Sequence, residues 1–308
     1  MKATRQSFGE ALIELGARYD NLVVLDADLL KSVNTHGFAQ RFPQRFIQMG
    51  IAESNMLGVA AGLALSGFIP FACSFASFLS GRYETIRISV AYSKANVKIV
   101  GTHCGVGIGE DGHTQMGLED ISIMRNLPGI TVIQPVDDIE TRQAVEFAIH
   151  HDHAVYLRLT RQPVEQVNKD DYRFEWGKGV VLKEGSDILL LATGALVYNV
   201  LQAARELEKE NIHARVVNIH TIKPIDRALL LKQIKKTKRI MTFEDHSIIG
   251  GLGSAVAEVI SEQESVGLKR IGINDTFGES GSMEELYRKF GFDKESIKQS
   301  IKRFLRRD

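Results

Sequence analysis

Short runs of apolar, often β-branched residues alternate along the chain with longer segments in which apolar residues recur every three or four positions. The short runs are typical of strands buried in a parallel sheet, and the longer segments are typical of helices that cover its two faces. Strands are predicted at residues 22–26, 45–49, 71–74, 97–102, 131–134, 155–159, 187–193, 214–218, 239–244 and 270–273. Helices are predicted at residues 6–19, 53–66, 77–93, 196–209, 226–235, 253–262 and 294–305. The pattern therefore predicts an α/β fold built on parallel sheets.

The periodicity fades between the two halves of this pattern. Residues 166–184 are rich in charge, contain the only tryptophan of the chain and show no strong period. Such a stretch is typical of a linker between domains. We therefore expect a first α/β domain at residues 1–165, a linker at residues 166–184, and a smaller α/β domain at residues 185–308.

The overall composition narrows the class of protein. The 308 residues carry 38 Lys and Arg against 38 Asp and Glu, and 44% of them are hydrophobic. This hydrophobicity excludes wholesale disorder, and the balanced charge argues against a nucleic-acid-binding protein. The apolar runs are shorter than a membrane span, the first residues do not resemble a secretory signal, and two cysteines are too few for a disulfide framework. We expect a cytoplasmic protein with neither a membrane nor a nucleic-acid partner.

The loop at residues 101–115 carries the most chemistry. It combines glycines with titratable side chains, namely Gly105, Gly107, Gly109, Gly112, His103, His113, Glu110 and Asp111. Glycines permit positive φ and close backbone approach, and loops that follow parallel strands are where α/β sheets bind their ligands. The loop can therefore aim His103 and Asp111 at a small polar substrate. The alternative is a long ordered turn without a function.

Two other segments are ambiguous when taken alone. Glu53 begins a predicted Ala-rich helix directly after a strand, where an acid often serves only as a partner for the helix dipole. Phe75 and Phe78 lie three residues apart between a strand and a helix, where aromatic side chains more often pack in a core than form a stacking platform.

Taken together and in this order, the three segments resemble the C-terminal half of the transketolase family of thiamine-diphosphate enzymes. They are Gly-Ile-Ala-Glu-Ser-Asn-Met, Phe-Ala-Ser-Phe, and Thr-His-Cys-Gly-Val-Gly-Ile-Gly-Glu-Asp-Gly. The resemblance implies a pyrimidine-binding domain followed by a smaller transketolase C-terminal domain that serves mainly subunit contacts. It also implies that Glu53 contacts a ring nitrogen of the cofactor's aminopyrimidine, that Phe75 and Phe78 wall its pocket, and that His103 and Asp111 contact the substrate.

Further matches extend the resemblance over nearly the whole chain. The segments Ala-Thr-Arg, Leu-Asp-Ala-Asp and Leu-Arg-Leu-Thr-Arg lie where the family has them. The resemblance implies that Arg5, Ser32 and Arg161 bind a sugar phosphate, and that Asp28 lies near the thiazolium end of the cofactor. Paired guanidinium groups suit a phosphate because each can donate two parallel hydrogen bonds. Arg158, in the same segment, is expected to support the fold.

One departure from the family concerns proton handling. Gln115 stands where many microbial transketolases have a histidine, so that the loop resembles the animal-type sequence. The resemblance implies that its side chain lies near the cofactor, where it can donate or accept a hydrogen bond but is not a general acid. Any proton transfer would then fall to His103, to His113 or to the cofactor itself.

The larger departure is that the 308 residues contain no Gly-Asp-Gly magnesium motif. The resemblance therefore implies a split transketolase, in which a separate N-terminal subunit binds Mg²⁺ and the diphosphate of the shared thiamine diphosphate. No metal ligand is expected on this chain. The implied assembly is a heterotetramer that contains a homodimer of this chain, and the implied reaction moves a two-carbon ketol unit from a ketose phosphate to an aldose phosphate in the pentose phosphate pathway.

Three alternatives remain open at this point. The chain could be the beta subunit of a thiamine-dependent 2-oxo-acid dehydrogenase, although His103, Asp111 and Arg161 favour a phosphosugar. It could be a fragment of a deoxyxylulose-phosphate synthase, which Gln115 disfavours. It could also be a non-catalytic assembly subunit with the same fold, although Glu53 and its neighbours are intact.

Overall fold

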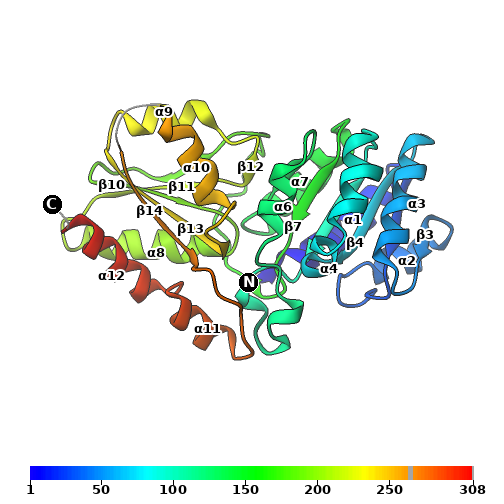
Figure 1. Ribbon diagram of the computed structural model, residues 1–308, viewed down its shortest axis with the longest axis horizontal. Coiled ribbons are helices and arrows are strands. Elements are labelled where there is room, and N and C mark those ends of the chain that lie inside the picture. Colours follow the sequence, from blue (N-terminus) through cyan, green and yellow to red (C-terminus); the bar gives the residue numbers. More distant parts are fainter. Residues whose placement is uncertain (263–265, 307–308) are drawn as a thin grey trace.

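The computed structural model describes residues 1–262 and 266–306. The described residues form a seven-stranded sheet, a five-stranded sheet and a two-stranded ribbon. Figure 1 shows the two larger sheets side by side, with the N-terminal half on the right and the C-terminal half on the left. This arrangement confirms the prediction of an α/β fold with mostly parallel sheets.

The seven-stranded sheet carries the first half of the chain. In spatial order its strands are β12 (Thr221–Lys223), β6 (Thr131–Ile133), β7 (Val155–Arg158), β5 (Lys98–Thr102), β4 (Ile69–Phe75), β2 (Leu22–Asp26) and β3 (Phe46–Gln48). All neighbours pair in parallel except β12, which pairs antiparallel with β6 and comes from the second half of the chain. The ribbon joins β1 (Lys2–Ala3) to β8 (Pro163–Val164).

Helices cover both faces of this sheet, which explains why its strands are continuously apolar. One face packs on α1 (Thr4–Gly16), α2 (His36–Arg41) and α7 (Asp138–His150). The other packs on α3 (Glu53–Leu65), α6 (Asp120–Asn126) and a π-helix at Ile86–Tyr92. Between them the central strands β5 and β7 are buried over their whole length.

The second half of the chain builds its own sheet. In spatial order its strands are β14 (Gly267–Ile273), β13 (Arg239–Ser247), β10 (Ile188–Ala192), β11 (Ala214–Asn218) and β9 (Val180–Lys183). One face packs on α8 (Leu196–Glu208), α11 (Met283–Phe290) and α12 (Lys294–Leu305), and the other on α9 (Arg227–Ile234) and α10 (Leu252–Ser261). Only β9 runs antiparallel to its neighbour.

Two sequence-based expectations differ from the structure. Residues 77–93 are not one helix, because the chain leaves the helical conformation at Arg82 (φ −112°, ψ 26°), directly after Gly81. Instead α4 (Ala76–Ser80), α5 (Tyr83–Thr85) and the π-helix follow one another. Residues 166–184 are not entirely a linker, since β9 pairs with β11 and extends the second sheet. A single strand added to an edge leaves little periodicity to recognise in the sequence.

No helix among the described residues is long and apolar enough to cross a membrane.

Candidate active site

The candidate residues gather where neighbouring parallel strands end. Phe75 closes β4 and pairs in register with Thr102, the last residue of β5, so that His103 follows directly beside it. Glu53 begins α3, the helix that runs back along β4. Because the carboxyl ends of parallel strands share one edge of a sheet, side chains from distant segments meet there.

Glu53 is a nearly buried carboxylate with spare acceptor capacity. Its side chain is 5% exposed, and its Oε1 accepts a hydrogen bond from Ser74 Oγ at 3.3 Å. The first turn of α3 adds the favourable field of a helix N-terminus. A carboxylate with several lone pairs and a single neutral donor can accept a further N–H donor from a ligand. This is the donor-acceptor chemistry that an aminopyrimidine ring nitrogen requires, so Glu53 fits the cofactor.

Three rings stack where β4 and β5 end. The centroids of Phe75 and Phe78 are 5.2 Å apart with an interplanar angle of 20°, and those of Phe75 and His103 are 3.7 Å apart with an angle of 24°. His103 has a left-handed backbone (φ 59°), which is uncommon for a residue other than glycine. The turn after β5 therefore holds the imidazole against the phenylalanine pair.

The electrostatic surroundings keep the His103 imidazole neutral. Burial, followed by the charges of Arg5 and Arg161, lowers its pKa from 6.5 to about 3. Arg5 approaches Nε2 at 3.5 Å, and Thr102 Oγ1 lies 2.9 Å from Nδ1. Because a guanidinium only donates, Nε2 is the acceptor and the ring proton resides on Nδ1. His103 can therefore exchange hydrogen bonds with a substrate hydroxyl, but it is not a cationic acid at neutral pH.

Two guanidinium groups, those of Arg5 and Arg161, lie near this histidine, and their positive charge is only partly neutralised by Asp111. Arg5 donates to the carbonyl of Ser32 at 2.5 Å, while its buried Nε has no hydrogen-bond partner within residues 1–262 and 266–306. Arg161 donates to the carbonyl of Ile108, and its Nε lies 3.7 Å from Asp111 Oδ2. Burial and the neighbouring Arg161 lower the pKa of Arg5, an effect that Asp111 partly offsets. Two cations that share one partly exposed carboxylate suit an anionic substrate group.

Asp28 and Gln115 make other contacts. Asp28 is exposed, with a positive φ of 64°, and its backbone N–H donates to Gln48 Oε1 at 2.8 Å. The buried acid of this turn is Asp26, which accepts hydrogen bonds from Leu29 N–H and Thr35 Oγ1. The side chain of Gln115 donates to Thr114 Oγ1 at 3.5 Å. The roles that the resemblance implies for Asp28 and Gln115 remain predictions.

Sequence reasoning assigned no role to Ser74 and Thr102, which contact Glu53 and His103. Ser74 is the penultimate residue of β4 and Thr102 is the last residue of β5, and each directly precedes a candidate residue, which is a signal present in the sequence. A third polar group nearby is the hydroxyl of Ser77, which is buried and lacks a partner within the described part of the chain. The hydroxyls of Ser74 and Thr102 thus orient Glu53 and His103.

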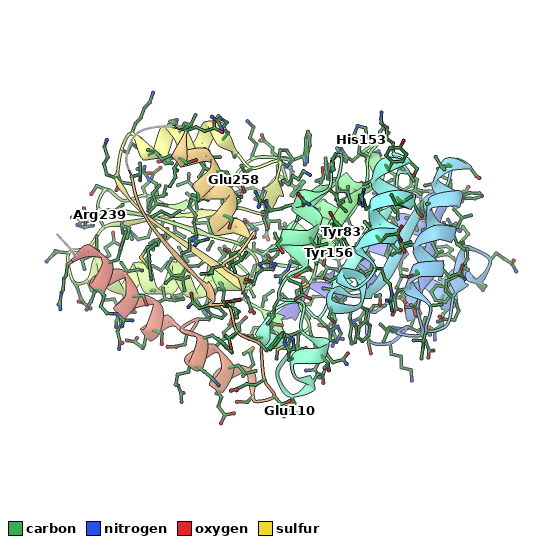
Figure 2. The ribbon with its side chains drawn as sticks, in the orientation of Figure 1. Tyr83, Glu110, His153, Tyr156, Arg239 and Glu258 are labelled. Atoms are coloured by element: carbon green, nitrogen blue, oxygen red, sulfur yellow. The ribbon has the colours of Figure 1, made fainter. Side chains whose placement is uncertain are left out.

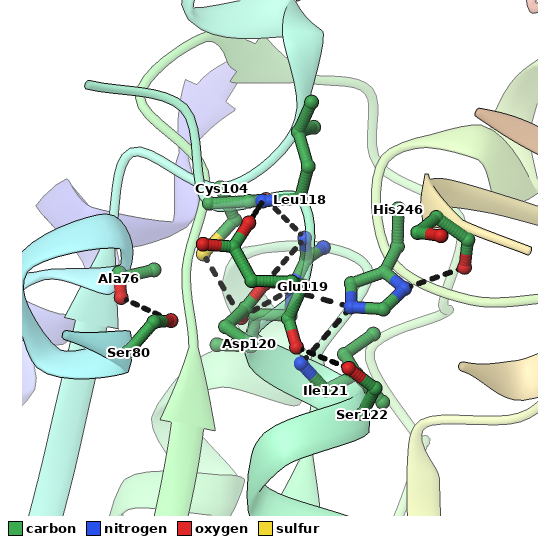
Figure 3. Close-up of polar contacts among 12 residues, drawn as sticks. Ala76, Ser80, Cys104, Leu118, Glu119, Asp120, Ile121, Ser122 and His246 are labelled. Atoms are coloured by element: carbon green, nitrogen blue, oxygen red, sulfur yellow. Dashed lines mark hydrogen bonds and ion pairs between the residues drawn. The ribbon is translucent and has the colours of Figure 1, made fainter. Parts of the chain in front are cut away.

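A buried ion pair contacts Cys104, within the glycine-rich loop, and the carbonyl of Gly117, just after it. Arg158 Nε donates to Asp120 Oδ2 at 2.8 Å, and both side chains are at most 1% exposed. Figure 3 shows Asp120 between Cys104 and His246. His246 Nε2 accepts the N–H of Ile121 at 3.1 Å, and burial lowers its pKa to about 4. Arg158 thus lies in a structural network that joins the two halves of the chain.

No group of three or more His, Cys, Asp or Glu side chains within the described ranges is arranged to hold a metal ion.

Both halves of the chain are similar to known proteins. Residues 1–166 match the family model of the transketolase pyrimidine-binding domain, and residues 177–297 match that of the transketolase C-terminal domain. A putative transketolase C-terminal section from Methanocaldococcus jannaschii is 49% identical over 305 residues, which cover 97% of this chain and 95% of the relative. A 6-deoxy-6-sulfo-D-fructose transketolase subunit from Clostridium sp. is 44% identical over 294 residues, which cover 95% and 91%.

A solved structure described as a split gene transketolase in an inactive beta4 tetramer superimposes with a TM-score of 0.92. It is 46% identical and covers 99% of both chains. The chain therefore belongs to the transketolase family, and its two halves are the pyrimidine-binding and C-terminal domains of that family.

Proposed function

We propose that this chain is the C-terminal subunit of a split transketolase that transfers a two-carbon ketol unit from a ketose phosphate to an aldose phosphate. The observation that carries the proposal is the position of Arg5, Arg161 and neutral His103 at the same edge of the sheet as Glu53. An anionic sugar can be held there next to a cofactor. Relatives described as a C-terminal section or a subunit, which this chain covers almost completely, support a two-chain enzyme.

Thiamine diphosphate is the proposed cofactor, shared with a separate N-terminal subunit. Glu53 would accept the ring N–H of the aminopyrimidine, and Phe75 and Phe78 would wall the pocket beside it. Asp28 is proposed near the thiazolium end, and Gln115 as a further cofactor contact. When bound, the cofactor supplies an electron sink for the carbon–carbon bond cleavage. The partner subunit would provide the Mg²⁺ ligands.

The remaining candidate side chains have complementary tasks. Arg5, Arg161 and the Ser32 segment would bind the phosphate of the sugar, which would leave its carbonyl end free to reach the cofactor. His103 would accept a hydroxyl hydrogen bond at Nε2 in place of its 3.5 Å contact with Arg5, and would hold that hydroxyl in position for proton transfer, while Asp111 would orient a second hydroxyl. The stacked Phe75 excludes water from one face of the imidazole.

The preferred donor sugar is a separate question. The relative from Clostridium is described as acting on a sulfo sugar, so an anionic group other than phosphate is used by a protein that is 44% identical. A pair of guanidinium groups can bind a sulfonate as well as a phosphate. We therefore propose an anionic ketose as the substrate class, with xylulose 5-phosphate as the first donor to test.

The test is a coupled transketolase assay with xylulose 5-phosphate, ribose 5-phosphate, thiamine diphosphate and Mg²⁺. We expect no turnover by this chain alone and turnover after the N-terminal subunit is added, in a heterotetramer with two copies of each. The related structure described as an inactive beta4 tetramer supports the first expectation. Full turnover by the chain alone would refute the need for a partner. A stable but silent complex that decarboxylates 2-oxo acids would instead favour the dehydrogenase subunit.

A further inference from the structure

The C-terminal domain holds the glycine-rich loop by a single buried carboxylate. Asp245, in β13, is 2% exposed. Its Oδ1 accepts the backbone N–H of Val106 at 2.8 Å, and its Oδ2 accepts that of Gly107 at 3.3 Å. Tyr287, in α11, donates its hydroxyl to the same Oδ2 at 3.3 Å. A buried carboxylate that accepts three hydrogen bonds is a strong and directional anchor.

The glycines of the loop are required by this anchor. Gly105 has φ 80°, and a Cβ at this position would lie 2.2 Å from Asp245 Oδ2. A Cβ on Gly107 would lie 2.2 Å from Gln162 Nε2, which itself donates to the Tyr287 hydroxyl at 3.1 Å. The loop can therefore sit on the carboxylate only because two of its residues lack side chains.

The far end of the loop also lies against the C-terminal domain. The N–H of Gly278 donates to His113 Nδ1 at 3.1 Å, and a Cβ on Gly112 would lie 2.5 Å from Ser280 Oγ. Figure 2 shows Glu110, within this loop, at the lower edge of the molecule next to α11. The segment from Gly105 to His113 is thus held at both ends by the second domain.

The anchored segment carries the groups that surround the proposed substrate. His103 precedes it by two residues in a left-handed conformation, which is maintained only if its surroundings hold it. Ile108, one residue beyond the anchored amides, offers the carbonyl that accepts from Arg161, and Asp111 lies 3.7 Å from the same guanidinium. A shift of Val106 and Gly107 would therefore move the partners of Arg161 together with the turn that holds His103.

We propose that Asp245 is a positioning residue for the substrate-binding loop, through which the C-terminal domain sets the geometry of sugar binding. Asp245 touches neither substrate nor cofactor, and it acts through the two amides and through Tyr287. The expected change in KM rests on the proposed function, whereas the expected effect on the loop amides does not. It extends the role implied for this domain beyond subunit contacts.

The experiment replaces Asp245 by Asn in the complex with the N-terminal subunit. An amide keeps the size of the carboxylate, but it removes the charge and turns an NH₂ group toward one of the two backbone N–H donors. We expect the KM for xylulose 5-phosphate to rise at least about tenfold while the affinity for thiamine diphosphate changes less than about threefold. Faster hydrogen exchange at the Val106 and Gly107 amides should accompany this change.

Glu244→Gln is the matched control. Glu244 is the adjacent residue of β13, equally buried, and its carboxylate accepts the N–H groups of Leu252 and Gly253 within its own domain. Its replacement should lower the melting temperature in the same way without changing the KM or the exchange of the loop amides. Tyr287→Phe removes one of the three donors to Asp245 and should raise the KM by a smaller factor, which keeps the test open if Asp245→Asn folds poorly.

The outcomes separate the two proposals. If both buried-acid variants lose only stability, with equal KM values and equal loop exchange, Asp245 is structural and the positioning role is wrong. If Asp245→Asn loosens the loop amides while the wild-type complex shows no transketolase activity, the anchor stands and the proposed function fails. A raised KM in Asp245→Asn and Tyr287→Phe, but not in Glu244→Gln, establishes the positioning role.

Discussion

The two ends of the candidate site are built on different electrostatic principles. At Glu53 a nearly buried carboxylate accepts a hydrogen bond from the Ser74 hydroxyl. Around His103 two guanidinium groups share one partly exposed carboxylate, so that the local charge is positive. The comparison indicates that one sheet edge can offer an N–H acceptor at one end and an anion site at the other. It also suggests that substitutions at the two ends should affect different kinetic constants.

Glu53→Gln is expected to have the largest effect. The amide keeps the shape and one acceptor oxygen, but it removes the negative charge that favours the N–H form of the bound ring. In the complex with the N-terminal subunit, turnover should fall about 1000-fold or more, while the KM for the donor changes little and the far-UV circular dichroism is unchanged. Normal turnover in this variant would remove the assignment of the cofactor end.

Arg161→Ala should act at the other end, on binding rather than on turnover. Loss of hydrogen bonds to a charged group is worth about 2 to 3 kcal/mol, so the KM for a phosphorylated donor should rise about 30- to 160-fold. An unphosphorylated ketose should be used no less well than by the wild type. Arg161→Lys is the matched control, since it restores the charge without the fork and should recover only part of the affinity. Equal losses on both donors would contradict an anion site.

The lowered pKa of His103 should make the free energy of unfolding depend on pH. The pKa of His103 is lowered to about 3 in the folded chain, against 6.5 when exposed. Below pH 6.5 the unfolded chain takes up a proton that the folded chain does not, so stability falls as the pH falls from 6.5 toward 3. At pH 5 this linkage costs about 2 kcal/mol.

His103→Asn should remove this part of the pH dependence. Urea unfolding of the wild type and the variant at pH 7 and pH 5, at matched protein concentration, measures the difference. The variant should lose about 2 kcal/mol less between the two pH values. Parallel losses would mean that His103 titrates in the folded chain and that the surrounding arginines do not control it.

Ser74→Ala is expected to have the smallest effect of these substitutions. It removes the 3.3 Å hydrogen bond to Glu53 but leaves the carboxylate charged. A neutral donor at this distance contributes about 0.5 to 1 kcal/mol, which corresponds to a two- to fivefold lower turnover. Steady-state kinetics at saturating donor would detect it. A loss as large as that of Glu53→Gln would mean that the position of the carboxylate, rather than its charge, dominates.

Much of the fold follows from local patterns in the sequence. The predicted strands are confirmed within about two residues at most ends, because buried parallel strands appear as short apolar runs. Helices α2, α6, α7 and α11 were not predicted, although α7 and α11 each carry a start signal. Asp137 caps α7 by accepting the N–H of Glu140, and Ser282 forms a capping box with Glu285 at the start of α11. Both capping signals are present in the sequence itself.

Other features depend on contacts that no local pattern contains. The sequence marks His103 and the loop glycines as chemically interesting, but the lowered pKa of that imidazole comes from burial and from arginines 98 positions before it and 58 positions after it. Asp245 lies in an ordinary strand sequence, and its bonds to Val106 and Gly107 join residues about 140 positions apart. Such couplings exist only once both sheets are assembled.

The strand β12 has a consequence for the division of the chain into modules. It belongs to the second half in sequence but completes the first sheet by pairing with β6. A fragment of residues 1–166 would leave the N–H and C=O groups of β6 without this partner, as a free sheet edge. Such an edge is a template for pairing with another molecule. The C-terminal half therefore covers an edge of the first sheet, and we expect a fragment that ends at residue 166 to self-associate more readily than the whole chain.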